Sequence, residues 1–208
     1  MKVIKICGLT EENQARHIAQ IGATHLGVIF FEKSPRHISI EKIKSIKQAV
    51  SDLDVKVVAV VVNPDDDTVE KLLNIVDIVQ LHGEEDLNFL KLFEKDRLLK
   101  AIRIKDENSL KDVEMFYKAG FTVLVDAFSK DAYGGTGKQI DKELLKKVKT
   151  ITNGNFILSG GLSPENVGNL VKEFRPMGVD ASSKLEVAPG IKDLDKVKEF
   201  IDTVKELG

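Results

Sequence analysis

The sequence predicts an α/β protein with one domain, in which eight parallel strands close into a (β/α)8 TIM barrel. Short apolar, β-branched runs alternate with charged amphipathic stretches along the whole chain. Such an alternation is typical of βα units, which form a parallel sheet, and eight units fit a closed barrel. The apolar runs are almost uninterrupted, as expected of strands buried on both faces. An open doubly wound sheet is the alternative, because periodicity alone does not establish closure.

The eight predicted strands are four to six residues long in most cases and are rich in Val, Ile and Leu. In order they are Val3–Ile6, Leu26–Phe30, Val57–Val62, Ile78–Leu81, Leu98–Ile102, Thr122–Val125, Phe156–Leu158 and Met177–Ala181.

Helical patterns separate these strands. The tripeptide Ser163-Pro164-Glu165 offers an N-cap followed by proline at the first helical position. Three other stretches, beginning near Asn13, at Glu41 and near Asp193, place apolar residues at helical spacing. Their apolar positions are Ile18 and Ile21, then Ile43, Ile46 and Val50, and finally Val197, Phe200, Ile201 and Val204.

Composition restricts the class of protein. The chain has 208 residues and a formal net charge of −2, which argues against a general binder of nucleic acid or of a membrane surface. No linker or low-complexity tract divides it, so we expect one catalytic domain over 1–208. Neither a membrane span nor a signal-peptide pattern is found, which predicts a cytoplasmic protein. The sequence leaves open whether it is a monomer or a homodimer.

The expected site contains no cofactor and no metal. The single cysteine excludes an internal disulfide and a cysteine-rich metal centre, and the four histidines are scattered. We therefore expect acid–base chemistry carried by protein side chains alone.

In a barrel of this kind the active site lies at the C-terminal ends of the strands. Cys7 ends the first strand and Asp126 ends the sixth. A thiol and a carboxyl on different sides of the ring can act as general base and general acid on a substrate held between them. A helix N-terminus after Cys7 would favour its thiolate. The alternatives are a small core residue for Cys7 and a loop cap for Asp126.

Two further residues follow strands. His82 ends the fourth strand and is either a site residue or a structural histidine that anchors its loop. Arg36 follows the second strand and is either a solvated loop charge or a clamp for a substrate carboxylate, which its planar guanidinium suits.

Glycine- and serine-rich loops follow the seventh and eighth strands. They contain Gly160 and Gly161, and Ser182 and Ser183. Backbone N–H groups and helix N-termini at this place commonly bind phosphate in such barrels, which predicts a phosphorylated small molecule as substrate. The segment 133–141 contains GGTGK but lacks the complete P-loop pattern, and we interpret it as a mobile flap.

Taken together, these motifs resemble the phosphoribosylanthranilate isomerase family of tryptophan biosynthesis over the whole chain. The resemblance rests on KICGLT, SPRHIS, VQLHGEE, LVDA with GGTGK, LSGGLSPENV, and VDASSKLE with PGIKD. It implies an isomerase that carries out an Amadori rearrangement of N-(5-phosphoribosyl)anthranilate to 1-(2-carboxyphenylamino)-1-deoxyribulose 5-phosphate.

The resemblance also implies residue roles. Cys7 would be the base at sugar C2 and Asp126 the acid at the ring oxygen. Arg36 would contact the anthranilate part, with His82 and Asp180 as neighbours in the substrate site. The phosphate would be bound by Gly160, Gly161, Ser182 and Ser183.

One position departs from the family pattern, because Lys184 stands where glycine is common. If this position needs a positive φ, lysine strains it; alternatively its ammonium helps to bind the phosphate. Two other functions compete with the isomerase: a metal-dependent phosphosugar epimerase on a related barrel, and a non-catalytic sensor of a phosphorylated ligand.

Overall fold

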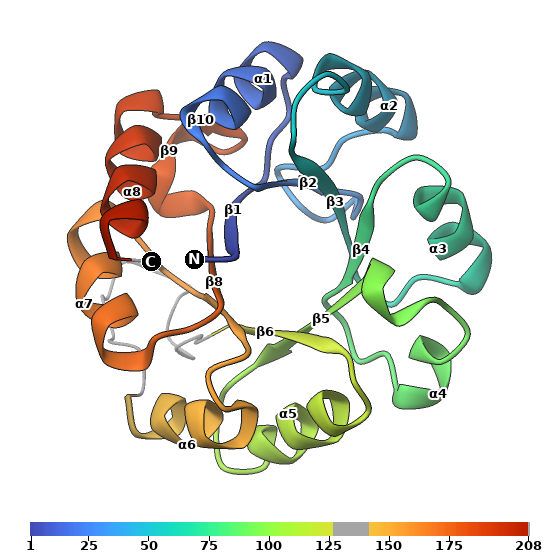
Figure 1. The fold of residues 1–208 in the computed structure, drawn as a ribbon. Coiled ribbons are helices and arrows are strands. Elements are labelled where there is room, and N and C mark those ends of the chain that lie inside the picture. Colours follow the sequence, from blue (N-terminus) through green and yellow to red (C-terminus); the bar gives the residue numbers. More distant parts are fainter. Residues whose placement is uncertain (127–141, 208) are drawn as a thin grey trace.

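The eight barrel strands pair in sequence order and the ring closes between the first and the last. The computed structural model describes residues 1–126 and 142–207, and all its barrel strands are parallel (Figure 1). This confirms the closed barrel and removes the open sheet. The strands are β1 (Val3–Cys7), β2 (His25–Ile29), β3 (Lys56–Val61), β4 (Ile78–Leu81), β5 (Leu98–Arg103), β6 (Thr122–Asp126), β7 (Ile157–Ser159) and β8 (Gly178–Ala181).

A helix follows each strand and the helices form a ring around the barrel. The α7 helix begins as predicted, because Ser163 and Asn166 form a reciprocal capping box with Pro164 in the first turn. The helices are α1 (Glu12–Ile21), α2 (Ile40–Ala49), α3 (Asp66–Leu73), α4 (Leu87–Leu90), α5 (Ser109–Lys118), α6 (Lys142–Thr152), α7 (Pro164–Phe174) and α8 (Leu194–Leu207), with single 3-10 turns η1 (Lys95–Arg97) and η2 (Ser183–Leu185).

A small antiparallel hairpin interrupts the last βα connection. Its strands are β9 (Glu186–Ala188) and β10 (Ile191–Lys192), and it follows η2 directly. The alternation of apolar runs did not predict it, because β9 and β10 are short and largely exposed.

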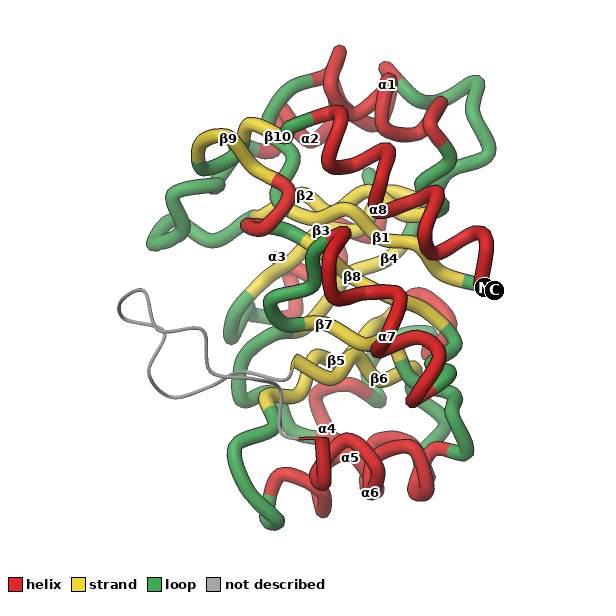
Figure 2. The backbone as a smooth tube through the Cα atoms, turned by 90° about the vertical axis from the view of Figure 1, so that its left-hand side faces the viewer, coloured by secondary structure: helices red, strands yellow, loops and turns green. Residues whose placement is uncertain are grey.

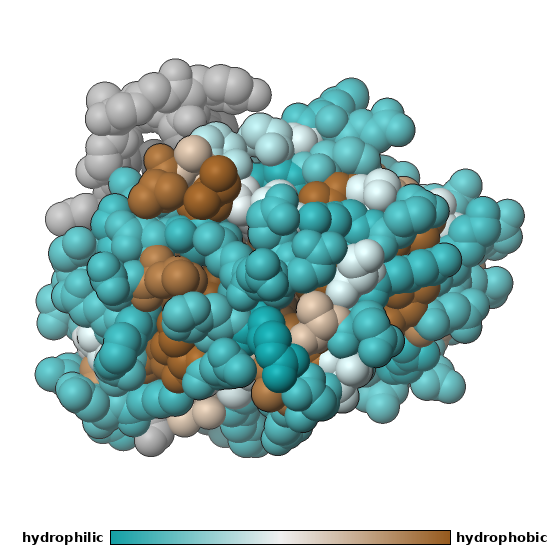
Figure 3. Space-filling model, turned by 90° about the horizontal axis from the view of Figure 1, so that it is seen from above, coloured by the Kyte–Doolittle hydropathy of each residue, from teal (hydrophilic) through white to brown (hydrophobic). Residues whose placement is uncertain are grey.

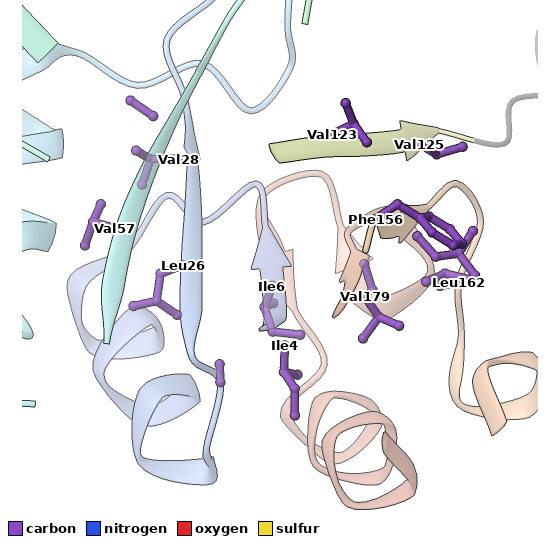
Figure 4. Packing of buried hydrophobic residues seen from close by; sticks show 14 of the residues in the cluster. Ile4, Ile6, Leu26, Val28, Val57, Val123, Val125, Phe156, Leu162 and Val179 are labelled. Atoms are coloured by element: carbon purple, nitrogen blue, oxygen red, sulfur yellow. The ribbon is translucent and has the colours of Figure 1, made fainter. Parts of the chain in front are cut away.

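The larger core lies between the barrel and the helices. Alternate residues of each strand face outward, as Ile4 and Ile6 of β1 and Leu26 and Val28 of β2 do (Figure 4). These side chains are 3% exposed or less and pack against the apolar faces of the helices. Strands covered in this way need apolar residues on their outer face, which explains their near-continuous apolar sequence.

The inside of the barrel has two different halves. Near the N-terminal ends of the strands it is filled by a separate apolar cluster, which includes Leu99, Leu124 and Ile157. Toward the C-terminal ends the inward-facing side chains become polar, beginning with the fully buried Lys5 of β1 and Gln80 of β4. The polar half is therefore the one that carries chemistry.

The two ends of the barrel are also distinct from outside. Figure 2 shows the chain termini at one end and the β9–β10 hairpin at the opposite end, where the strands finish. Seen from above, the surface is mainly hydrophilic with separate apolar patches (Figure 3). No helix in the described ranges is long and apolar enough to cross a membrane.

Candidate active site

The Cys7 thiol lies inside the barrel, at the end of β1. Cys7 as a whole is 6% exposed and pairs in register with Gly27 of β2. A Cβ atom on Gly27 would stand 2.6 Å from the thiol sulfur, so only glycine leaves room for the thiol there. The Ser182 hydroxyl donates a 3.0 Å hydrogen bond to the Cys7 carbonyl oxygen, which joins β1 to the loop after β8.

The environment of Cys7 corrects one expectation from the sequence. Four residues separate Cys7 from α1, which begins at Glu12, so the thiol does not lie at a helix N-terminus. Burial raises the pKa of the Cys7 thiol above its usual value, whereas the nearby ammonium of Lys5 opposes that shift. Any thiolate is therefore stabilised by a buried cation rather than by a helix dipole.

Lys5 forms the central ion pair of the barrel interior. Its Nζ lies 2.8 Å from Oδ1 of Asp180, and its side chain is fully buried. The second oxygen of Asp180 accepts a 2.9 Å hydrogen bond from the Ser159 hydroxyl. Burial by itself would lower the pKa of Lys5, but Asp180 and Cys7 raise it, so the ammonium form is retained. Both carboxylate oxygens of Asp180 are thus bound by side chains of β1 and β7.

Asp126 and His82 form the second polar group of the site. Asp126 ends β6 and His82 follows β4 directly, and the His82 Nε2 atom lies 3.6 Å from Oδ2 of Asp126. The Gln80 amide donates a 3.2 Å hydrogen bond to Nδ1 of His82. A neutral His82 therefore carries its proton on Nε2, the nitrogen that faces Asp126. The carboxyl and the imidazole are partly exposed at 18% and 21%, within reach of a small molecule.

The Arg36 side chain passes next to the backbone of Gly8, the residue after Cys7. A Cβ on Gly8 would stand 2.6 Å from Cδ of Arg36, so glycine allows the arginine to approach this closely. The guanidinium donates from Nε and Nη2 to the two carboxylate oxygens of Glu186, at 2.8 and 2.5 Å. Glu186 also accepts a 2.7 Å hydrogen bond from Lys192. Burial would raise the pKa of Glu186, but hydrogen bonds from these two cations lower it to about 2.

The predicted phosphate loops lie after β7 and β8. Gly160 and Gly161 have φ angles of 100° and 65° and lead into the N-terminus of α7. Ser182 precedes the 3-10 turn η2, which begins at Ser183. Lys184 lies within this helical turn and has no positive φ, so lysine causes no backbone strain there. The structure thus removes one of the two expectations for Lys184.

Two expectations remain outside these observations. The flap predicted at 133–141 lies outside the described residues. Among the described residues, no group of three or more His, Cys, Asp or Glu side chains is arranged to bind a metal ion. The expectation that the site needs no metal and no cofactor stays a prediction, to be tested in solution.

Comparisons with known proteins agree on one family. The model of the N-(5'-phosphoribosyl)anthranilate (PRA) isomerase family matches residues 4–203. The chain belongs to this family. A PRA isomerase of Sulfurihydrogenibium sp. (strain YO3AOP1) is 52% identical over 203 residues, which cover 98% of each chain. The crystal structure of the Thermotoga maritima phosphoribosyl anthranilate isomerase has a TM-score of 0.88 and 33% identity, and the match covers both chains completely.

A further solved PRA isomerase carries a ligand. It holds reduced 1-(o-carboxyphenylamino)-1-deoxyribulose 5-phosphate, with a TM-score of 0.86, 31% identity and complete coverage of both chains. Neither the phosphosugar epimerase nor the non-catalytic sensor is favoured by these comparisons. The resemblance to the PRA isomerase family that the motifs suggested is confirmed, and the chain is an isomerase of tryptophan biosynthesis.

Three charged residues of the site were not predicted from the sequence. Lys5 lies in an apolar strand, and Glu186 and Lys192 lie in the unpredicted hairpin. One signal was available for Lys5, because it lies on the same strand face as Val3 and Cys7, and a lysine that faces the barrel interior is buried and needs a partner. No comparable signal marked Glu186, whose partner Arg36 is 150 residues away.

Proposed function

We propose that this chain converts N-(5-phosphoribosyl)anthranilate into 1-(2-carboxyphenylamino)-1-deoxyribulose 5-phosphate, with Cys7 as general base and Asp126 as general acid. The observation that supports these roles is the placement of both groups at strand ends on the same end of the barrel. Cys7 ends β1 and Asp126 ends β6, with β8 and β7 between them. A small substrate in the barrel mouth is then flanked by a base and an acid.

The rearrangement has two proton transfers. Asp126 gives a proton to the ring oxygen of the sugar as the C1–O bond breaks, and the nitrogen lone pair forms the C1=N double bond of an iminium ion. Cys7 thiolate then removes the proton from C2, the electrons of the C–H bond form C1=C2, and the iminium nitrogen is neutralised. The resulting enol tautomerises to the ketone at C2. The iminium ion itself accepts the electron pair, so the side chains supply proton transfer and positioning.

Lys5 and His82 support the two catalytic groups in this proposal. The Lys5 ammonium lies beside Cys7 and favours the thiolate over the thiol by charge. His82 faces Asp126 across 3.6 Å and orients the carboxyl. Asp180, which is bound to Lys5, acts through that ammonium, and its predicted contact with substrate stays a prediction.

Substrate binding uses the two ends of the ligand. We assign the anthranilate carboxylate to Arg36, whose guanidinium lies next to Gly8 at the barrel mouth. The phosphate is assigned to the backbone around Gly160 and Gly161 and to Ser182 and Ser183, which precede or begin helical turns.

The direct test is the fluorescence of phosphoribosylanthranilate, which decreases when the substrate rearranges. Purified protein is expected to abolish the signal with multiple turnovers. Iodoacetamide is expected to modify Cys7, the only thiol of the chain, and to abolish turnover, and a bound product analogue should slow the modification. Full alkylation with normal turnover would remove Cys7 from the mechanism.

The metal-dependent alternative has its own test. Exhaustive dialysis against EDTA is expected to leave the isomerase activity unchanged, because the proposed steps use side chains alone. Loss of activity that only a divalent ion restores would contradict this assignment.

A further inference from the structure

Arg36 and Glu186 form a bidentate ion pair at the mouth of the barrel. Nε and Nη2 of the guanidinium each donate to a different oxygen of the carboxylate, at 2.8 and 2.5 Å. This pairing uses one edge of the planar guanidinium and fixes its plane. Nη1 makes no hydrogen bond to any described residue, so the free edge, formed by Nη1 and the second N–H of Nη2, remains available.

Glu186 is itself held in place by buried polar groups. Its side chain is 4% exposed, and the Lys192 side chain that donates to it is fully buried. Lys192 also donates to the Ser182 carbonyl oxygen at 3.2 Å. The backbone of Lys192 exchanges two hydrogen bonds with the Gln14 side chain on α1, at 2.9 and 3.1 Å. The hairpin that supplies Glu186 is therefore tied to the barrel at several points.

The charge of this cluster is not balanced within itself. Two cations, Arg36 and Lys192, share the single carboxylate of Glu186. One positive charge is left over, and the more exposed of the two cations is Arg36, with 19% of its side chain exposed. An anion that binds at the free edge of Arg36 completes the neutralisation.

The cluster adjoins the reacting groups. Arg36 crosses Gly8, the residue after Cys7, and a Cβ added to Gly8 would stand 3.0 Å from the Ser182 hydroxyl oxygen. An anionic group of the substrate at the free edge of Arg36 is then next to the proposed base and to the proposed phosphate loop.

We propose that Glu186, supported by Lys192, is a positioning residue that fixes the Arg36 guanidinium so that its free edge meets the substrate carboxylate. The β9–β10 hairpin thereby determines that the enzyme prefers an aromatic amine bearing a carboxylate over one without it. This inference rests on the proposed function, and it adds the residues that confer selectivity for the acidic part of the substrate.

The experiment compares two substrates on three proteins. One substrate is phosphoribosylanthranilate and the other is its aniline analogue, which lacks the carboxylate. The proteins are the parent, Glu186→Gln, and Asp52→Asn. Asp52 also forms a bidentate pair, with Nη1 and Nη2 of Arg16, but on the exposed surface, and serves as the matched control. Turnover of phosphoribosylanthranilate by the parent is measured first, so failure of the function itself is seen separately.

The measured quantity is selectivity, the ratio of kcat/KM for the two substrates. Glu186→Gln is expected to lower it by about tenfold or more, mainly through KM of the carboxylate-bearing substrate, because a charge-assisted bond is lost. Asp52→Asn should leave selectivity unchanged. An equal effect of Glu186→Gln on both substrates would show a merely structural role and overturn the proposal. A lower KM for phosphoribosylanthranilate would also overturn it, since Glu186 would then be a competitor for Arg36.

A second variant covers the case in which Glu186→Gln unfolds because Lys192 is left buried without its partner. Glu186→Gln with Lys192→Met removes both buried charges together. This double variant is expected to fold and still to show reduced selectivity. Parental selectivity in a folded double variant would contradict the proposal.

Discussion

The two halves of the barrel interior are built from the same eight strands but differ in the polarity of the side chains that line them. At the N-terminal ends of the strands, residues such as Leu99, Leu124 and Ile157 form a dry apolar cluster. Toward the C-terminal ends, the inward positions hold Lys5 and Asp180 as a buried ion pair, and then Cys7 and Asp126. A single strand therefore passes from a position that stabilises the fold to one that supports chemistry within two or three residues.

Stability and activity are therefore separated along the barrel axis. Apolar side chains contribute stability through burial, which requires no orientation. Polar groups in the other half need partners at defined distances, as Asp180 of β8 has in Lys5 and Ser159 on the two neighbouring strands. Substitutions in the two halves should accordingly have different consequences, which four measurements can examine.

The largest effect is expected at the polar end. Asp126→Asn keeps the shape of the side chain and removes the transferable proton. We expect kcat to fall by about 10²–10⁴-fold, the usual contribution of a positioned acid or base, with little change in the melting temperature. Steady-state kinetics and thermal unfolding of the same preparation test this separation. A variant within a few fold of the parent would show that the polar end does not use this carboxyl.

At the apolar end the reverse result is expected. Leu124 is fully buried in the inner cluster, and Leu124→Ala should reduce the free energy of unfolding by about 2–5 kcal/mol. Activity per folded molecule should stay close to that of the parent at a temperature where the variant is folded. Denaturant unfolding gives the first quantity and active-site titration the second. A loss of kcat without destabilisation would show that the apolar half contributes to catalysis and would contradict the separation.

Binding alone should respond at the phosphate loop. A Cβ on Gly161 would meet no atom within 4 Å, although its φ of 65° is a left-handed one. Gly161→Asp is expected to raise KM by at least about tenfold, because it places a negative charge near the phosphate. Gly161→Asn is the control, since asparagine has nearly the same shape and also tolerates this φ. Equal KM values for the two variants would place the phosphate elsewhere.

The smallest effect is expected at Lys5, which lies between the apolar and the polar half of the barrel interior. Lys5→Met removes the ammonium beside Cys7, so the pKa of the thiol should rise further, by about one unit or more. The thiolate is the reactive form, so the rise of alkylation rate with pH should move to higher pH. Lys100→Met is the control, because Lys100 is equally buried in an ion pair with Glu85 but faces outward from β5. A shift of the same size in both variants would show that general destabilisation, and not charge, is measured.

Much of this arrangement could be predicted from the sequence. The β-branched runs predicted all eight strands to within one or two residues, as with Val3–Ile6 against the observed Val3–Cys7. Such predictions succeed because a strand that is buried on both faces forms a continuous apolar run, which is a local feature of the sequence. The search for reactive residues at the C-terminal ends of the strands also predicted that Cys7 and Asp126 end their strands at the same end of the barrel.

The remaining features depend on distant parts of the chain. The Arg36–Glu186 pair joins residues 150 positions apart. The prediction that a helix N-terminus favours the Cys7 thiolate was wrong, because burial raises the pKa of the thiol. The α4 helix is only one turn long, which is too short to produce an apolar periodicity. A contact such as the Arg36–Glu186 pair forms only in the folded ring, and no local pattern predicts it.

The Lys5–Asp180 pair has a consequence for how the protein assembles. Its partners are 175 residues apart, on the first and last barrel strands. While the chain is being synthesised, Lys5 emerges early and has no carboxylate to meet until β8 has left the ribosome. A ring of fewer strands would expose the ammonium to water or bury it alone, and the second state is strongly unfavourable. A barrel that lacks β8 therefore lacks the partner of its buried ammonium, and the last strand completes the charge balance of the interior.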